Sequence, residues 1–343
     1  MESDEITTTK ANARIGPLTL NAALSAAHGA ERFDAVTVEQ RPAIVWRWPS
    51  QAPERLSIPG FAHLIDTLRD AELAGVAQVL HGSVATDHSV IAFMRPAGES
   101  LRNYLRRGKT SPLEAVTSAL SLIDALMALR SLGIRGAWWT PETLWVTEDE
   151  AQWTLAAPGL TSTLRFLEPT SLDELVFRAP ELAGRVELSE LEDQGYAAVA
   201  AYAIGATLFY SLLNRFPYTC SSTNDYLDAQ QSQDAPRVED EDENLVPHKQ
   251  LSDIVVRCLE KDPALRPHSI EAIRRSLEEA QQEARFQHSR VDYLPARVSE
   301  THQMPRPNRA GEGEKPQDEA RSRFFPLLAL ISLVAIALFL IGR

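Results

Sequence analysis

Few groups of residues in this chain have a type and spacing typical of a catalytic or metal site. Its two cysteines, Cys220 and Cys258, have no Cys or His neighbour at the spacing of zinc ligands. Its eight histidines form no His-Glu-x-x-His or other metal-binding pattern. Gly108-Lys109-Thr110 has the ending of a P-loop, but Asn103 stands where that motif needs its first glycine, and no strand leads directly into it. These patterns predict no metal site and no P-loop.

Acidic side chains outnumber basic ones. The 343 residues carry 47 Asp and Glu against 34 Lys and Arg, which gives a formal net charge of −13. Nucleic-acid binding needs clustered Lys and Arg, so this balance argues against a nucleic-acid partner. The most acidic run is Glu239-Asp240-Glu241-Asp242-Glu243, within a polar stretch over residues 219–250. The run is either a solvated loop or a docking surface for a basic partner.

The elements that would position a site are strands in the first part of the chain and helices in the second. Apolar residues make up 44% of the chain, enough for a sizeable core. A helix is predicted to begin at Ser111, because Ser111, Pro112 and Glu114 supply an N-cap, a first-turn proline and a capping-box acid. Gly133 can end this helix. The other predictions are strands over 43–48 and 90–94, a hairpin from 143–146 and 152–155, and helices over 61–73, 196–213, 254–259 and 269–284.

The two ends of the chain differ in kind. Residues 1–13 form an acidic tail without the basic start and apolar core of a secretory signal. Residues 285–323 contain four prolines and many polar side chains, which predicts a disordered linker. Residues 324–341 carry no charge and span about 27 Å as a helix, close to the hydrocarbon thickness of a bilayer.

Basic residues flank this apolar segment on both sides, which favours a cytoplasmic location for what precedes it. We therefore expect residues 324–341 to be a transmembrane helix that anchors the protein by its C-terminal end, with the folded part in the cytoplasm. The alternative interpretation of the segment is a buried core helix.

Three segments of the second half occur in an order and spacing typical of one family. They are Phe177-Arg178-Ala179-Pro180-Glu181, Tyr202-Ala203-Ile204-Gly205-Ala206-Thr207-Leu208 and Cys258-Leu259-Glu260-Lys261-Asp262-Pro263-Ala264-Leu265-Arg266-Pro267. Through them, roughly residues 14–284 resemble the bacterial-type eukaryotic-like Ser/Thr protein kinases.

The resemblance implies an α+β fold with two lobes. A small β-rich N-lobe would cover about residues 14–95, and a larger α-helical C-lobe would cover about residues 96–284. In this family the Arg of the late motif pairs with the Glu of the Ala-Pro-Glu segment. The resemblance therefore implies an ion pair between Glu181 and Arg266 that stabilises the fold.

At the catalytic positions, the resemblance implies that the residues a kinase needs for phosphotransfer have been replaced. A kinase needs a glycine-rich loop, a Lys–Glu pair, an Asp base, and an Asn and an Asp that hold magnesium. On the N-lobe side, the corresponding positions form a degenerate ATP cleft: Ser25, Ala27 and Ala30 at the three glycines (with Gly29 one residue out of register), Trp46 or Arg47 at the lysine, Leu64 near the glutamate, and Phe93 in the hinge strand.

In the catalytic loop, Pro141-Glu142 matches the family's Pro-Glu and sets the register. The mapped substitutions are Trp138 for the base, Thr140 for the loop lysine, Thr143 for the magnesium-binding Asn, Ala157 for the magnesium-binding Asp, and Ala200 for the Asp of the central helix. Losing one preorganised electrostatic group costs about 10²–10³ in rate, and losing a base costs about 10⁴. We therefore expect no catalytic residue, metal or cofactor and no magnesium-dependent phosphotransfer.

All six tryptophans lie in the strand of the mapped lysine or in the catalytic loop and the following hairpin. They either pack a cleft that no longer holds ATP or line an aromatic pocket for another ligand.

Two hypotheses for function follow. The first is a tail-anchored pseudokinase, a membrane-tethered binding or scaffolding module whose partner is a kinase, a phosphatase or a membrane complex. The second is a divergent Ser/Thr kinase or other ATP-using transferase with substitute residues such as Arg47, Asp66 or Glu142.

Overall fold

The computed structural model describes residues 13–27, 29–49, 57–85, 88–136, 138–147, 152–163, 171–184 and 191–292. The segment over 324–341, for which we expect a membrane span, lies outside these residues, as do most of the linker and nearly all of the N-terminal tail.

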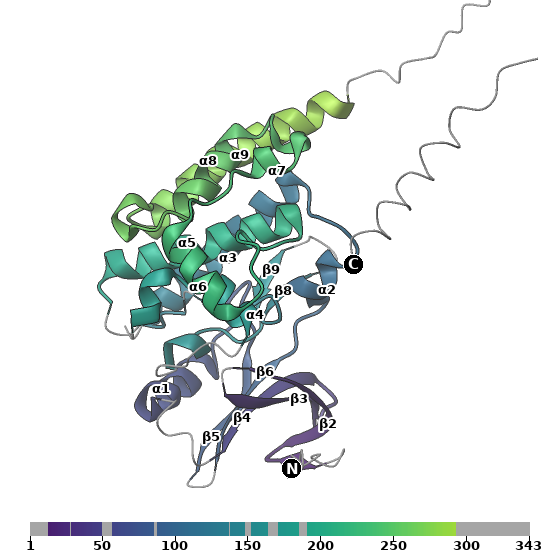
Figure 1. Ribbon diagram of the computed structural model, residues 1–343. Helices are drawn as coiled ribbons and strands as arrows, with labels where there is room; N and C mark the ends of the chain where they lie inside the picture. The colour runs from purple at the N-terminus through teal and green to yellow at the C-terminus, as the bar shows by residue number, and fades with distance from the viewer. Residues whose placement is uncertain are drawn as a thin grey trace, which may run out of the picture. The chain divides into compact units, whose positions relative to one another are not determined.

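A curled antiparallel sheet with one helix beside it forms the first lobe (Figure 1). The sheet has six strands in the order β1-β2-β3-β4-β6-β5. Its elements are β1 (Arg14–Ile15), β2 (Leu18–Ala27), β3 (Ala30–Thr37), β4 (Pro42–Pro49), α1 (Ile58–Leu68), β5 (Val79–Val84) and β6 (His88–Met94). The predicted strands over 43–48 and 90–94 are confirmed as β4 and β6. The predicted helix over 61–73 is α1, which begins earlier and ends at Leu68.

Successive side chains of a strand point to opposite faces of the sheet. Both faces of this sheet bury apolar side chains. On β4, Ile44, Trp46 and Trp48 point into the main core of the protein. Ala43 and Val45 point the other way, into a second small core inside the curl of the sheet. The alternation decides which β4 residues face the predicted cleft.

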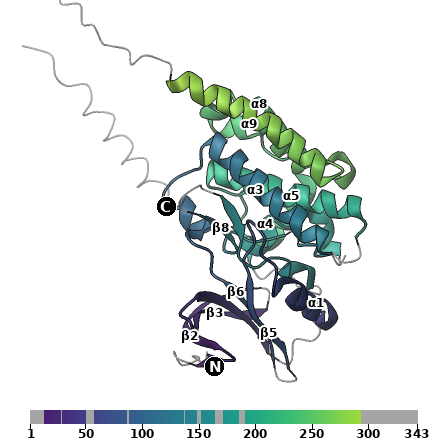
Figure 2. The same ribbon diagram turned by 180° about the vertical axis from the view of Figure 1, so that it is seen from behind.

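The second lobe is mainly helical, with a small three-stranded sheet, β7-β8-β9, next to the first lobe (Figures 1 and 2). Its elements are β7 (Glu99–Ser100), α2 (Leu101–Leu105), α3 (Pro112–Ser131), β8 (Leu144–Val146), β9 (Trp153–Leu155), η1 (Leu160–Thr163), α4 (Leu172–Val176), η2 (Pro180–Gly184), α5 (Asp193–Leu213), α6 (Thr223–Ser232), α7 (Val238–Glu241), η4 (Glu243–Leu245), α8 (Lys249–Cys258), η5 (Pro263–Leu265) and α9 (Ile270–Asp292).

The predicted start of α3 is confirmed in detail. The Ser111 side chain accepts a hydrogen bond from the Glu114 backbone N–H, and the Glu114 carboxylate accepts one from the Ser111 backbone N–H at 2.8 Å. Pro112 occupies the first turn. At the other end Gly133 has a φ of +78°, the left-handed conformation that glycine adopts at no steric cost, and the chain turns out of the helix there.

Helix α5 is the centre of the second lobe, and every residue from Tyr196 to Leu213 is buried. It lies very close to α8. A Cβ atom added at Gly205 would stand 2.6 Å from the Cβ of Cys258, so glycine is needed at this crossing. Cys258 is fully buried there and Cys220 is partly exposed; neither forms a disulfide.

Two described helices, α3 and α5, are long and apolar enough to cross a membrane. Half of the most apolar window of α3 and all of that of α5 are buried inside the protein. A core helix of a soluble protein meets the same criteria, and both helices pack in the core of the second lobe.

The structure corrects two expectations about the polar segments. The stretch over 219–250 is not a loop, because it contains α6, α7 and η4. Helix α9 was expected to end at 284, but it continues to Asp292, so the linker cannot begin at 285. Both segments are short of apolar residues, and partners elsewhere in the lobe supply their contacts.

The acidic run over 239–243 is bound into the lobe by ion pairs. Glu239 accepts from Arg237 Nε at 2.6 Å, Glu241 pairs with Arg215 at 2.6 Å, and Asp242 pairs with Lys109 at 3.1 Å. Three of the five carboxylates therefore have intramolecular partners, which removes much of the charge that a basic partner would recognise.

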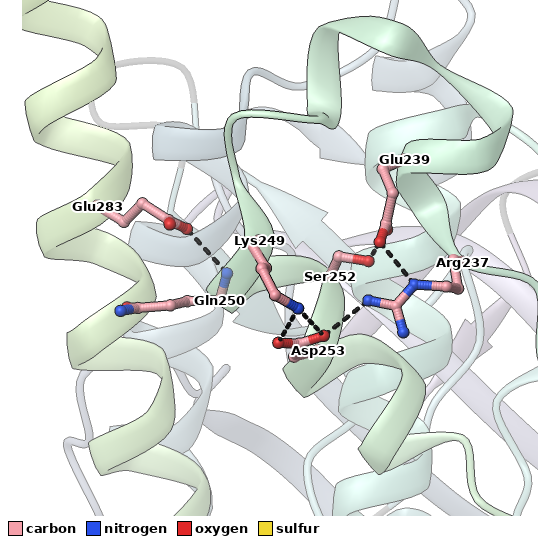
Figure 3. A network of polar contacts seen from close by, with 7 residues as sticks. All are labelled: Arg237, Glu239, Lys249, Gln250, Ser252, Asp253 and Glu283. Carbon is pink, nitrogen blue, oxygen red and sulfur yellow. Dashed lines mark hydrogen bonds and ion pairs between the residues drawn. The ribbon is translucent and has the colours of Figure 1, made fainter.

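Around α8 these contacts form a network that joins three helices (Figure 3). Asp253 on α8 accepts hydrogen bonds from Arg237, just before α7, at 2.7 Å, and from Lys249 at 2.9 Å. On the α9 side, Glu283 accepts from the backbone N–H of Gln250 at 2.9 Å. Figure 3 shows the side chains of Lys249 and Arg237 both pointing toward the Asp253 carboxylate.

Candidate functional site

The candidate site is the region between the first lobe and the catalytic-loop segment, where the resemblance places the ATP cleft. The two lobes are hydrogen-bonded to each other there. The backbone N–H of Ala77 donates to the carbonyl of Leu155 at 2.9 Å, and the N–H of Leu155 donates to the carbonyl of Gly75 at 2.9 Å.

The strands that would form the glycine-rich loop make a tight hairpin. Ala27 pairs with Ala30, and Gly29 in the turn has a φ of +71°. Ala30 is buried in the core, whereas Ser25 is exposed and its carbonyl faces back to the next strand. The hairpin thus keeps one glycine with left-handed backbone, one residue away from the mapped positions.

The structure distinguishes between Trp46 and Arg47, the two candidates for the lysine position. Trp46 is buried and faces the predicted cleft, stacked on Trp48 with ring centroids 6.2 Å apart. Arg47 lies on the opposite face of β4, where its Nε donates to Glu31 at 2.7 Å. The cation that could have replaced the lysine therefore points away from the cleft.

Apolar side chains fill the rest of this side of the cleft. Phe93 on β6 is fully buried, and Phe61 of α1 packs edge-on against Trp48 with centroids 5.6 Å apart. Leu64, at the mapped glutamate position, is buried in the same core. Asp66 on α1 is exposed and lies 4.0 Å from Arg69, so it does not enter the cleft.

Sequence reasoning missed Arg32 on β3, the charged residue in this apolar surface. Arg32 is only 5% exposed, and its guanidinium carbon lies 4.7 Å from the centre of the Trp46 ring. Burial lowers the pKa of Arg32, and the opposite charge of Glu142 acts in the other direction. The strand pairing places Arg32 directly opposite Trp46, so both side chains lie on the same face of the sheet, and the sequence alone did not give this register.

At the mapped position of the base, Trp138 is a packing and hydrogen-bonding residue. Its indole Nε1–H donates to the carbonyl of Glu174 on α4 at 3.2 Å, and Arg178 lies over its ring at 5.6 Å. Thr161 donates to the Trp138 carbonyl at 3.0 Å. Burial also lowers the pKa of Arg178, and the negative charge of the buried Glu174 acts in the opposite direction. An indole cannot accept a proton from a substrate hydroxyl.

The two threonines of the loop bond to each other. The backbone N–H of Thr140 donates to Thr143 Oγ1 at 2.9 Å, and the two hydroxyl oxygens lie 3.3 Å apart. Both side chains are buried. These hydrogen bonds stabilise the turn that leads into β8. The two threonines stand at the mapped positions of the loop lysine and of the magnesium-binding asparagine.

Beyond β9, Ala157 occupies the position of the magnesium-binding aspartate, and Gly159 follows it with a φ of +67°. A Cβ atom at Gly159 would collide with Ile134 and Leu64. A Cβ at Gly136 would come within 2.7 Å of the Gly159 backbone. These segments are in direct backbone contact, which leaves no room for added side chains at either glycine.

Glu142 is a carboxylate in the catalytic-loop segment, and its ion-pair partner is basic. It accepts from Arg102 Nε on α2 at 2.8 Å, and Arg102 also pairs with Asp173 on α4. No group of three or more His, Cys, Asp or Glu side chains within the described part of the chain could hold a metal ion.

The ion pair implied between Glu181 and Arg266 is present in the structure. It is bidentate, with nitrogen–oxygen distances of 2.7 and 2.9 Å. Arg266 also donates to the carbonyls of Glu260, Ala198 and Lys261, and its guanidinium lies 5.1 Å from the Tyr202 ring centre. Its side chain is completely buried, whereas that of Glu181 is 25% exposed.

Four of the six tryptophans are buried core residues: Trp46, Trp48, Trp139 and Trp153. Trp139 also donates to Thr207 at 2.9 Å, which ties the loop to α5. For these four rings the packing interpretation holds, since each is at most 2% exposed.

Comparison with solved structures finds protein kinase domains. The kinase domain of PknI from Mycobacterium tuberculosis superposes with a TM-score of 0.57 and 13% identity, over 80% of this chain and all of that one. A double mutant of that domain gives a TM-score of 0.59 at 14% identity, over 81% of this chain and all of that one. Rad53 in complex with AMP-PNP gives 0.57 at 14% identity, over 74% of this chain and 63% of that one.

This likeness shows that the chain has a protein-kinase-like fold, with a curled β-sheet N-lobe and a helical C-lobe. At these identities it shows the fold alone. No protein-family model matches the chain, and none of the curated proteins matches it. The chain spans less than two thirds of the Rad53 fragment. The rest of the Rad53 fragment has no counterpart in the alignment.

Proposed function

We propose that this protein is a tail-anchored pseudokinase, a kinase-like binding or scaffolding module without magnesium-dependent phosphotransfer. One observation carries the proposal. The mapped positions of the base and of the two magnesium ligands carry no ionisable side chain, and the side chains with polar groups there form hydrogen bonds within the protein. Trp138 bonds to the Glu174 carbonyl, Thr143 bonds to Thr140, and Ala157 offers no ligand.

The enzymatic alternative needs substitute residues, and the placement of the three candidates does not favour it. Arg47 pairs with Glu31 on the face of the sheet opposite to Trp46. Asp66 is exposed on α1. Glu142 is engaged with Arg102. A magnesium ion bound to nucleotide phosphates would need one or two carboxylates facing it.

The proposed partner is a protein in a signalling assembly, either a kinase, a phosphatase or a membrane complex. The proposed location is the cytoplasmic face of a membrane, held by the apolar segment over 324–341. Its 18 uncharged residues and their basic flanks support the anchor. The hydrogen bonds of Trp138 and Thr143 support the binding or scaffolding role, because they are structural contacts at positions where a kinase carries catalytic groups.

The proposal is tested by thermal unfolding of the full chain in detergent, with ATP and with or without magnesium or manganese. We expect no metal-dependent rise in Tm. A ligand present at 100 times its Kd would add about 2.7 kcal/mol to the free energy of unfolding. A metal-dependent rise of several degrees, or transfer of labelled phosphate to a protein substrate, would overturn the proposal.

A further inference from the structure

Helix α2 and the loop after it are basic in a protein that is acidic as a whole. Arg102, Arg106, Arg107 and Lys109 lie within eight positions and no acidic residue lies among them, whereas the chain carries a net charge of −13. The loop also contains Gly108-Lys109-Thr110, the P-loop-like ending, which has no role in the proposed function. Basic residues gathered in one segment attract anions to it.

A cavity of about 480 Å³ lies against this loop. Its described walls are formed by Tyr104, Arg107, Gly108 and Lys109, and by Val146 and Thr147 at the end of β8. Two of these six residues are cations, and none of the six is acidic. The volume is within the range of small-molecule sites, which is about 300–1,000 Å³. The hairpin turn over 148–151 lies outside the described residues and is not part of this site.

The two cations of the cavity keep hydrogen-bond donors available. Lys109 Nζ pairs with Asp242 at 3.1 Å, and Arg107 pairs with Glu99. Neither carboxylate belongs to the described cavity walls, and the two basic side chains are 46% and 66% exposed. An ammonium has three donors and a guanidinium has five, so a single carboxylate partner does not exhaust either group. Ion pairs this exposed are weak, and an anion can compete for the cations.

The backbone and a ring shape the cavity for an anion. Gly108 has a φ of +152°, and a Cβ atom added there would meet nothing within 4 Å, so the loop backbone is open at this point. The guanidinium carbon of Arg107 lies 5.5 Å from the centre of the Tyr104 ring, a contact that orients the guanidinium. An oriented guanidinium binds two phosphate oxygens at once, and an ammonium adds a compact charge.

We propose that this cavity binds a phosphate-bearing ligand through Arg107 and Lys109. The phosphate belongs either to the headgroup of an anionic lipid or to a soluble phosphate compound. The site goes beyond the proposed function, since it uses none of the mapped catalytic positions. Only the lipid source depends on the proposed membrane anchor, which would keep the folded part close to anionic headgroups.

Calorimetric titration of the full chain in an uncharged detergent tests the site, with pyrophosphate as the probe and no metal present. The cavity variant carries Arg107→Gln and Lys109→Gln. The matched control carries Arg215→Gln and Lys261→Gln, an arginine and a lysine of the same lobe that each pair with one carboxylate. We expect the cavity variant to bind pyrophosphate at least about tenfold more weakly, because it loses two charge-assisted contacts, and the control to bind like the wild type.

Two results would overturn the proposal. One is a wild type that does not bind pyrophosphate. The other is an equal loss of affinity in the cavity variant and in the control, which would mean general attraction between charges. Both variants replace partly exposed side chains, and thermal unfolding checks that they fold. Either result leaves the absence of phosphotransfer untouched, whereas metal-dependent ATP binding would overturn the proposed function and leave this site standing.

A second measurement separates the two sources of phosphate. The full chain is placed in phosphatidylcholine nanodiscs with or without a phosphoinositide, and hydrogen exchange of residues 104–110 is followed. Slower exchange with the phosphoinositide, in the wild type and not in the cavity variant, would support the lipid headgroup. Unchanged exchange together with binding of pyrophosphate would support a soluble phosphate compound as the ligand of the same site.

Discussion

Arg266 uses every donor that its guanidinium has. Its Nε bonds to one carbonyl, and each terminal nitrogen bonds to one Glu181 oxygen and one further carbonyl. All five N–H groups of this fully buried side chain are therefore satisfied. An arginine buried so completely is stabilising only as long as its carboxylate remains, since the carbonyls alone do not neutralise its charge.

The first prediction is that Glu181→Ala and Arg266→Ala each lower the free energy of unfolding by about 3–5 kcal/mol, because each leaves its partner unpaired in or near the core. Urea unfolding followed by circular dichroism measures the change. The control is Lys249→Ala, which removes the exposed pair of Lys249 with Asp253 and should cost at most about 0.5 kcal/mol. An Arg266→Ala variant as stable as the control would show that the pair is not structural.

The second prediction concerns Trp138. Restoring the mapped base alone with Trp138→Asp should produce no phosphotransfer, because Thr143 and Ala157 still provide no magnesium ligand. The variant also loses the indole that donates to Glu174 and packs under Arg178, so a lower Tm is expected. Radiolabelled ATP with a general protein substrate is the measurement. Measurable transfer by this single variant would mean that metal ligands exist elsewhere in the cleft.

At the scale of secondary-structure elements, local signals in the sequence predicted best. The Ser111–Glu114 capping box, the left-handed Gly133 and the alternating apolar residues of β4 each act over a few residues, so the sequence alone was sufficient. The segment over 219–250 was misjudged because its contacts are long-range. Glu241 and Asp242 find Arg215 and Lys109, which a local pattern cannot reveal.

The candidate site was mapped onto the sequence through local motifs. The mapped catalytic positions follow from Pro141-Glu142 and from the Ala-Pro-Glu segment, both of which are local motifs. The register of β4 was open between Trp46 and Arg47, and only the strand pairing assigns Trp46 to the inner face. Arg32 was overlooked because its burial follows from the pairing of β3 with β4, which sets its guanidinium over the ring of Trp46.

The third prediction concerns the network of α7, α8 and α9 in Figure 3. Hydrogen bonds from Lys249 and Arg237 lower the pKa of Asp253. A carboxyl whose pKa is depressed on folding stabilises the protein above its unfolded pKa of about 4, and this contribution is lost as pH falls through the folded pKa. Asp253→Asn should therefore be less stable than the wild type at pH 7, by at most about 1 kcal/mol for so exposed a pair.

The difference between wild type and Asp253→Asn should shrink steadily below about pH 4, as the wild-type carboxyl takes up a proton. Unfolding in urea at a series of pH values from 3 to 7 measures it. High salt should reduce the difference at pH 7, because the pair is exposed to solvent. A difference that is the same at pH 3 and pH 7 would mean that the side-chain amide disturbs packing and that charge plays no part.

At the scale of the whole molecule, the described residues form a kinase-like fold without the segment proposed to enter the membrane. The cores of both lobes are formed by residues between Leu18 and Ala284. Helix α9 continues past this core to Asp292. If the apolar segment over 324–341 is an anchor, the chain between them is a tether of about 30 residues with a mean reach of about 30 Å.

The fourth prediction is that a chain ending after Asp292 remains folded and leaves the membrane fraction. We expect the circular dichroism spectrum and the Tm of this variant to match those of the full chain in detergent within about two degrees, because no described core residue is removed. Flotation of expressed protein with membranes measures the location. Continued flotation of the shortened chain would place the membrane contact on the folded body itself.

The close crossing of α5 and α8 has a practical consequence. The chain has two thiols, and Cys258 is enclosed at the crossing, where burial raises its pKa to about 12. Thiol reagents attack the thiolate, so Cys258 should resist them as long as the protein is folded. Cys220 is partly exposed, although burial and the charge of Asp225 raise its pKa too. A maleimide dye should therefore label the native protein at one defined point without any mutation, and energy transfer from that dye to labelled lipid would report how far the body stands from the bilayer.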